Sequence, residues 1–169
     1  LKLFRKLEAD VEILRTVNSR LMKQVVENER QCWVNSQYTR RECLEFVGIP
    51  SSVNANELED KVISILDKIG VKVKERDIPA CHRLFGSDRT TVKLSNRKDT
   101  LKILRSKKIL NDMSAEDLDI PDKTKIYINE SLCPYYRGLW NKCKWLKTNN
   151  HIHSFFTISG IVKVKVEEK

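Results

Sequence analysis

The cysteine and histidine side chains are the first candidates for chemistry, because both residue types bind transition metals and both serve in nucleophilic catalysis. The chain has five cysteines and three histidines, and those considered as ligands are Cys81, His82, Cys133, Cys143, His151 and His153. No two cysteines are separated by two residues, and no histidine pair has the spacing of a zinc site. We therefore expect no metal ion and no cofactor.

Sequence motifs give equally little support for catalysis. The chain contains no nucleophile elbow, P-loop, dinucleotide fingerprint or zincin motif. Cys143 falls on one helical face with Leu139 and Leu146, which favours a place in the core. Glu130 and Asp77 are isolated acids at predicted strand edges. We expect that the protein is not an enzyme and that it has no catalytic residue.

The stretch SLCPYYRGLWNKCKWLK, residues 131–147, combines bases with aromatic residues. It holds four of the twelve Phe, Trp and Tyr residues, four bases and no acid. Surfaces that bind single-stranded nucleic acid have this composition, because cations hold the phosphates and rings stack on the bases. The same stretch is periodic, however, and its apolar helical face consists of Tyr136, Leu139, Trp140, Cys143 and Leu146. Most of the aromatic rings are therefore expected to be core.

The residues off that apolar face are the better candidates for contact. Tyr135 and Arg137 lie at the start of the predicted helix, where phosphate binding is favoured. Lys144 also projects away from the apolar face. Trp145 could stack on a base, although covering the following hairpin is its more ordinary role.

The charge of the chain is basic and unevenly distributed. The net charge is +9 over 169 residues. Residues 83–108 contain nine bases and two acids, whereas residues 112–122 contain five acids and no base. Clustered bases favour phosphate or an acidic partner, whereas solubility alone suits an even spread. We include Arg97, from this basic cluster, among the expected contacts.

Composition also bounds the location of the protein. No apolar run approaches the roughly 20 residues that span a bilayer, and the N-terminal segment is too charged for a signal peptide. The lack of such a run argues against a membrane partner. An odd number of irregularly spaced cysteines favours a reduced, intracellular protein. Because the sequence begins with Leu1 rather than Met, we expect it to be a fragment.

Residues 4–32 follow the heptad pattern of a coiled coil. With Phe4 at position a, the predicted oligomerisation residues at a and d include Leu7, Val11, Leu14, Asn18, Leu21 and Val25. Val at a and Leu at d favour a parallel homodimer, in which Asn18 would fix the register. Val17 and Met22 widen the apolar stripe and keep a trimer open. A lone amphipathic helix packed on the adjacent domain is the alternative.

Strand and helix patterns alternate after this helix. The predicted order is strand 43–50, helix 54–70, strand 71–85 with an interruption at Pro79, strand 89–95, helix 96–110 and strand 125–132. Asn54 and Glu57 have the spacing of a capping box, and Asn96 is expected to cap the second helix. The acidic residues 111–124 are expected to form a loop. The β-α-β-β-α-β order predicts a ferredoxin-like domain, the order that RNA-recognition motifs (RRMs) also have.

The last segment predicts a small additional unit. Pro134 suits the first turn of a helix that runs to about Thr148, and Ser159-Gly160 between two apolar strands indicates a hairpin. The chain as a whole is predicted to be α+β. Its expected domains are a coiled-coil helix at 1–40, an RRM-like domain at 41–132 and a helix with a β-hairpin at 133–169.

The predicted sheet lacks the aromatic residues on which RRMs stack bases. The strand RTTVKLS (89–95) has none, and CLEFVGI (43–49) has only Phe46, which suits the core as well as the surface. The order of strands alone is thus weak support for RNA binding.

The order of motifs resembles a known family. The segments RRECLEFVGIP, DIPACHRL, TTVKLSNRKDTLKIL and KIYINESLCPYYRGLWNKCKWLK are similar to those of the proteins encoded by the first open reading frame of LINE-type non-LTR retrotransposons. They also resemble the few-polyhedra (FP) proteins of baculoviruses. The resemblance covers essentially the whole chain, and its last segment is the most specific.

This resemblance implies a homo-oligomeric protein that binds single-stranded RNA or DNA and acts as a nucleic-acid chaperone in a ribonucleoprotein, in the cytoplasm and also in the nucleus. The nucleic acid would lie in a cleft between the RRM-like and C-terminal domains. The family motifs match Arg83, Lys93 and Arg137 as basic contacts. They place the aromatic contact at Phe155 or Phe156, of which Phe155 is our choice.

Alternatives remain open at this stage. Arg83 could cover the sheet with its aliphatic stem, and Lys93 could be a solvated strand residue. The acidic loop could repel nucleic acid or regulate access to the cleft. Mammalian relatives form trimers, whereas the heptads here favour two strands. A coiled-coil protein–protein scaffold with a degenerate RRM is the competing function.

Overall fold

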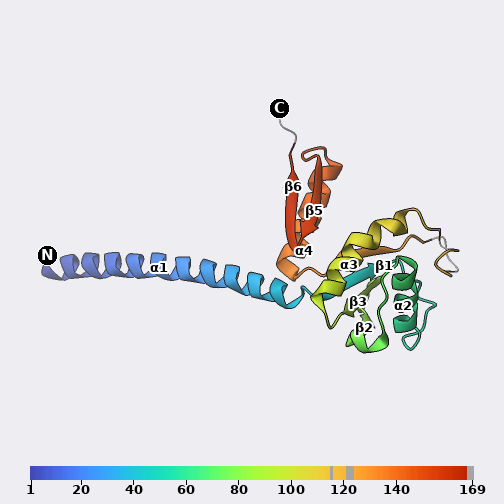
Figure 1. Cartoon of the computed structure of the whole chain (residues 1–169). Coiled ribbons are helices and arrows are strands. Elements are labelled where there is room, and N and C mark those ends of the chain that lie inside the picture. Colours follow the sequence, from blue (N-terminus) through green and yellow to red (C-terminus); the bar gives the residue numbers. More distant parts are fainter. Residues whose placement is uncertain (115, 121–123, 167–169) are drawn as a thin grey trace. The chain divides into compact units, whose positions relative to one another are not determined.

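The computed structural model describes residues 1–114, 116–120 and 124–166 (Figure 1). Contacts between residues divide the chain into two compact units, Leu1–Ser36 and Gln37–Lys169. The predicted α+β class is confirmed, and the larger sheet is antiparallel. Among the described residues, no helix is long and apolar enough to cross a membrane.

The first element is a helix, α1, that spans Lys2–Thr39 and is longer than the predicted 4–32. Neither Gly nor Pro occurs before Gly48, so nothing in the sequence interrupts it. The apolar heptad residues from Phe4 to Val25 are about half exposed or more, from 44% at Val11 to 73% at Phe4. An apolar stripe of this kind remains largely unburied in the single chain.

Four strands form an antiparallel sheet in the order β2-β3-β1-β4. They are β1 (Cys43–Val47), β2 (Ala80–Arg83), β3 (Arg89–Lys93) and β4 (Tyr127–Glu130). Helix α2 (Leu58–Lys68) follows β1, and helix α3 (Arg97–Ser106) follows β3, with 3₁₀ turns at Glu75–Asp77 and Lys107–Asn111. The predicted β-α-β-β-α-β order is therefore the observed one.

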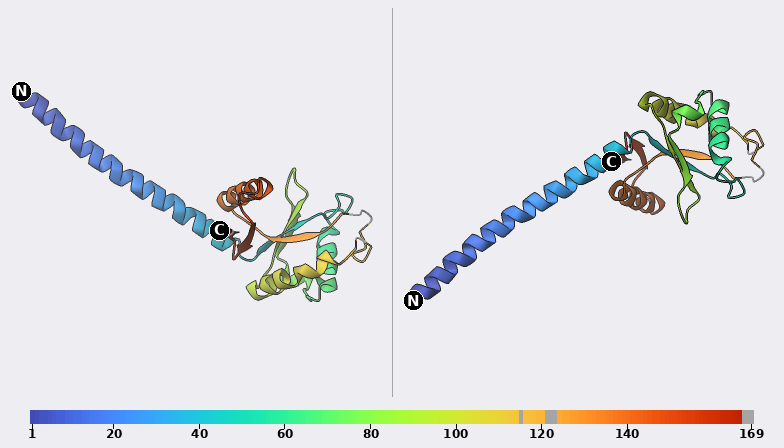
Figure 2. Two further views of the ribbon diagram at one scale, coloured as in Figure 1. Left: turned by 90° about the horizontal axis from the view of Figure 1, so that it is seen from above. Right: turned by 90° about the horizontal axis from the view of Figure 1, so that it is seen from below.

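One face of this sheet is the core, because alternate side chains of a strand point to opposite faces. Leu44 and Phe46 of β1 are fully buried. They join Leu58, Val62 and the other apolar residues of α2 and α3 in one cluster. Both views in Figure 2 show α2 and α3 on one side of the sheet and α4 on the other. Phe46 is a core residue and cannot stack on a base.

Two local predictions are wrong. Residues 71–74 (VKVK) are not a strand, although Val71 and Val73 are buried, and the second strand is Ala80–Arg83 alone. Their alternation reflects burial against the core, while the 3₁₀ turn precedes the first paired residue, Ala80. The capping box is also absent from the described helix start, where Glu57 is the N-cap without a side-chain hydrogen bond.

The predicted cap at Asn96 is confirmed, and a glycine ends the first strand. Asn96 caps α3 by accepting a hydrogen bond from the amide of Lys98 at 2.8 Å. Gly48 ends β1 with a φ of +95°, and a Cβ there would lie 2.3 Å from the carbonyl oxygen of Lys125. Glycine is required at this position for both reasons.

The C-terminal segment forms α4 (Pro134–Thr148) and the hairpin β5 (Ser154–Ile158) with β6 (Ile161–Lys165). Ser159 and Gly160 both have positive φ, as a type I′ turn requires. Cys143 is buried on the apolar face of α4, and Trp140 packs edge-on against Phe155 with ring centroids 4.6 Å apart. Trp145, by contrast, is 60% exposed, so the prediction that it covers the hairpin is wrong.

The acidic segment after α3 is held by two lysines of α2. Lys61 donates to the carbonyl oxygens of Leu118 and Asp119 at 2.7 and 2.6 Å, and Lys68 pairs with the Asp119 carboxylate at 2.7 Å. The hydrogen bond and charge of Lys68 lower the pKa of Asp119. The described part of this segment is therefore held against α2 by these hydrogen bonds. The predicted loop at 111–124 also includes residues 115 and 121–123, which lie outside the described residues.

Candidate nucleic-acid interface

The open face of the sheet, opposite Leu44 and Phe46, is where the predicted interface would lie. Strand pairing places its residues in three rows, Ala80–Lys93–Cys43, His82–Thr91–Glu45–Asn129 and Arg89–Val47–Tyr127. The central row contains a carboxylate, Glu45, and the outer rows contain the bases Lys93 and Arg89. The middle of the face therefore carries charge rather than aromatic rings, and Tyr127 lies at its edge.

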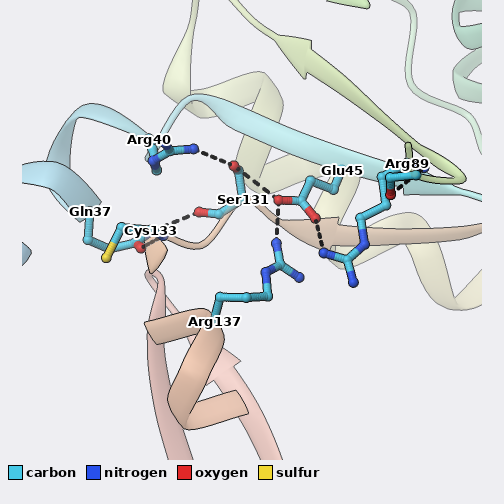
Figure 3. Close-up of polar contacts among 8 residues, drawn as sticks. Gln37, Arg40, Glu45, Arg89, Ser131, Cys133 and Arg137 are labelled. Carbon is cyan, nitrogen blue, oxygen red and sulfur yellow. Dashed lines mark hydrogen bonds and ion pairs between the residues drawn. The ribbon is translucent and has the colours of Figure 1, made fainter. Parts of the chain in front are cut away.

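Glu45 is the centre of a polar cluster on this face. Its side chain is only 4% exposed. Arg137 of α4 donates to its Oε1, Arg89 of β3 lies 3.7 Å from its Oε2, and the Ser131 hydroxyl donates to Oε1 at 3.3 Å (Figure 3). A buried carboxylate is stable only when paired in this way. The pair with Arg137 therefore ties the start of α4 to the open face.

Bases outnumber acids in this cluster. Arg40 reaches the Ser131 hydroxyl at 3.5 Å, and Lys93 is exposed one row away. Burial raises the pKa of Cys43, and the charges of Lys93 and Arg40 oppose that shift. Arg89 and Arg137 thus pair with Glu45, while Arg40 contacts its neighbour Ser131 and Lys93 lies in the adjacent row. The four bases and Glu45 together carry a surplus of three positive charges. Such a surplus attracts phosphate.

Two further contacts fix the C-terminal unit at this place. The Gln37 side chain donates to the carbonyl of Ser131 and accepts from the amide of Cys133, both at 2.9 Å, and is 6% exposed. The amide of Gly160 donates to Glu130 Oε1 at 3.0 Å. A Cβ on Gly160 would lie 2.2 Å from Gln37 Nε2. The hairpin turn and the linker before α4 therefore both pack at Gln37.

Two predicted contacts are engaged in structural hydrogen bonds. Arg83 donates to the carbonyl of Ile49 at 2.9 Å, to that of Val53 at 3.2 Å and to that of Pro50. These bonds fix the segment after β1. Arg97 donates to the carbonyl of Arg41. Binding phosphate with either guanidinium would compete with these bonds. The structure therefore does not bring Arg83 and Arg97 into the cluster around Glu45.

The remaining predicted contacts lie on or near α4 and the hairpin. Tyr135 is 37% exposed and packs edge-on against Tyr136, with centroids 5.3 Å apart. Lys144 is exposed. Phe155 faces Trp140, whereas Phe156 is 44% exposed and lies opposite Lys163. Of the two Phe residues that the family motif allowed, the exposed one is not the one chosen.

The sequence reasoning missed Glu45, Gln37 and Ser131. One signal was available for Glu45, because an acid in the middle of the apolar strand CLEFV requires a partner. Nothing in the sequence identified that partner, since Arg137 lies 92 positions away. Gln37 carried no signal within its helical pattern.

Cysteine chemistry receives little support from the geometry. Burial raises the pKa of Cys81 to about 11, with Glu59 adding to the shift and Arg83 opposing it, so its thiolate is disfavoured at neutral pH. Within the described ranges, no three His, Cys, Asp or Glu side chains are grouped so as to hold a metal ion.

A scan against protein-family models and a search of curated proteins both find no match for this chain.

Proposed function

We propose that this chain is a homo-oligomeric protein that binds single-stranded nucleic acid and acts as a nucleic-acid chaperone in a retrotransposon-type ribonucleoprotein. The motifs that resemble the LINE first-open-reading-frame and FP proteins support this proposal. So does the strand order β2-β3-β1-β4 with two helices on one face, which suits an RRM-like domain. The expected location is the cytoplasm, with the nucleus as a second site.

The observation that carries the proposal is the surplus of three positive charges on the open face. Arg89 and Lys93 come from the sheet, Arg40 from the segment after α1, and Arg137 from α4. Phosphates of a flexible strand can adapt to such a patch, whereas a rigid duplex has one fixed phosphate spacing. A charged face without an aromatic platform on its central strands favours binding with little sequence preference.

The exposed heptad stripe of α1 supports oligomerisation through a coiled coil. Leu7, Leu14 and Leu21 would occupy d positions, and Asn18 an a position, in a parallel dimer, with a trimer as the other state. Linking several weak sites in one oligomer multiplies their affinity. Weak, multiple and sequence-tolerant contacts are what a chaperone that rearranges strands requires.

The direct test compares two lysine substitutions of equal charge change. Binding of a labelled, arbitrary-sequence single-stranded RNA is measured at low salt for wild type, Lys93→Glu and Lys72→Glu. Lys93 is exposed on the open face, and Lys72 is exposed in the segment after α2, outside all strands. We expect a clear loss for Lys93→Glu and a much smaller change for Lys72→Glu. Equal effects would mean that the open face is not the binding site.

The scaffold function is the second candidate, and two observations favour it. The central position of the open face holds Glu45 and no aromatic ring. The outer face of the hairpin exposes Phe156, Ile158 and Ile161, which would suit a protein partner. An absence of RNA binding at low salt, with oligomerisation intact, would favour this function.

A further inference from the structure

Helix α4 carries a continuous polar and aromatic stripe on the side away from its packed face. Arg137, Asn141, Lys144 and Trp145 follow the spacing i, i+4, i+7, i+8, so they lie along one side of the helix. The last three are exposed. The rise of a helix places Trp145 about 12 Å from Arg137 along the axis. The stripe therefore begins at the Glu45 cluster and leads away from it.

The stripe ends on a pair of stacked rings. Trp145 lies over His151 with centroids 5.9 Å apart and an interplanar angle of 30°. A Schellman motif brings the two together, because Asn150 has a φ of +58°, its amide donates to Lys147, and the amide of His151 donates to Leu146. A side-chain contact often accompanies this motif. The contact explains why His151 lies beside Trp145, but not why a tryptophan remains 60% exposed.

The described segment that carries this ring pair is basic in formal charge. Residues 131–166 contain six Lys and Arg residues and no Asp or Glu. Lys142 and Lys144 flank Trp145 on the same helix. This basic charge favours a polyanionic partner. The exposed indole favours a polyanion that also has aromatic groups.

We propose that Trp145, supported from one side by His151, is a stacking platform for one unpaired base of a single-stranded nucleic acid. This inference rests on the proposed nucleic-acid-binding function and extends its site. The phosphates enter at the open face, and the strand follows the α4 stripe to the indole. Stacking on an indole does not depend on base identity, since every base has a π-face.

The test separates the contribution of the bases from that of the phosphates. Two probes of equal length and charge are used, a 12-nucleotide oligouridine and the same backbone with abasic residues. Binding of both is measured for wild type, Trp145→Ala, Trp145→Phe and Phe85→Ala. Phe85 is a fully exposed aromatic residue between β2 and β3, and serves as the matched control. Circular dichroism and thermal unfolding verify that each variant is folded.

Loss of one stacked base predicts a roughly 5- to 150-fold weaker binding of oligouridine by Trp145→Ala. Binding of the abasic probe should hardly change, and Trp145→Phe should retain most of the affinity. Phe85→Ala should behave like wild type. Quenching of tryptophan fluorescence by oligouridine should also be smaller in Trp145→Phe than in wild type.

Three results would overturn the inference. The first is an unchanged affinity of folded Trp145→Ala for oligouridine. The second is an equal loss of affinity for both probes in Trp145→Ala, and the third is an equal loss for oligouridine in Phe85→Ala. If wild type bound neither probe, the proposed function itself would be refuted, which is a distinct result.

Discussion

At the scale of single residues, the open face depends on how one buried carboxylate is paired. Glu45 reaches neither solvent nor the core face, so Arg137, Arg89 and Ser131 must satisfy it. A guanidinium group has five N–H donors. Arg137 donates to Glu45 through Nη2, so its other donors can hydrogen-bond a phosphate. The observed structural role of Arg137 and its proposed binding role therefore overlap.

Substitution of Arg137 should lower stability as well as binding. Arg137→Ala removes one partner of a buried charge, which we expect to lower the free energy of unfolding by about 1–3 kcal/mol. The double variant Glu45→Gln/Arg137→Gln removes both charges and should recover part of this loss. Urea unfolding of the two variants and wild type measures the difference. Equal stability of Arg137→Ala and wild type would mean that the pair contributes nothing.

Two glycines of the C-terminal unit should respond in opposite directions to alanine. Gly160→Ala places a Cβ against Gln37 at a φ of +76° and should destabilise by about 2 kcal/mol or more. Gly138→Ala meets no atom within 4 Å inside α4 and should stabilise by about 0.5–1 kcal/mol. Thermal unfolding of both variants is the measurement. A stable Gly160→Ala would contradict the close packing of the hairpin turn at Gln37.

At the scale of elements, sequence periodicity correctly predicted helices such as α2, whose apolar residues are buried along one face. It failed where the structure depends on which strands pair. Leu58, Val62 and Leu66 repeat once per turn, so α2 was predictable. Val71 and Val73 alternate as in a strand but have no ladder partners. The hairpin was predictable from Ser159-Gly160. Which of its faces packs on α4 was not, because that depends on the three-dimensional position of Trp140.

The acidic segment provides an element-scale prediction about pH. The hydrogen bond and charge of Lys68 lower the pKa of Asp119 below the ordinary value of an aspartate, so the ionised form is favoured in the folded state. The Asp119–Lys68 ion pair therefore contributes to stability above about pH 4, and this contribution is lost as the pH falls through the lowered pKa of Asp119. Unfolding of wild type and Asp119→Asn is measured between neutral and acid pH. The stability difference between them should shrink in acid; a constant difference would contradict the Lys68 contact.

Helix α1 provides its own test of the coiled coil. Cys32 occupies a predicted a position, where two parallel, in-register helices bring the thiols close together. Mild oxidation should give a cross-linked dimer on a non-reducing gel, and Cys32→Ser should abolish it. The control is Cys32→Ser/Lys23→Cys, which places the thiol at an outward f position and should cross-link poorly. Equal cross-linking of the control would contradict the heptad assignment.

At the scale of the whole molecule, three features of the chain fit the proposed function. An exposed heptad stripe would oligomerise it, a basic open face would hold phosphates, and the acid-free unit of residues 131–166 would extend the site. Sequence patterns gave the order of these parts. They could not give the cluster around Glu45, which brings together Arg40, Ser131 and Arg137 from distant parts of the chain.

The most direct measurement is the salt dependence of RNA affinity for the whole chain, with several unrelated single-stranded sequences. Three surplus charges on the open face predict a slope of log affinity against log salt of roughly −2 or steeper, similar for every sequence. Lys93→Ala should make the slope less steep by about 0.7, whereas Lys72→Ala should leave it unchanged. No binding at low salt, or a flat slope, would contradict the claim that the open face holds phosphates.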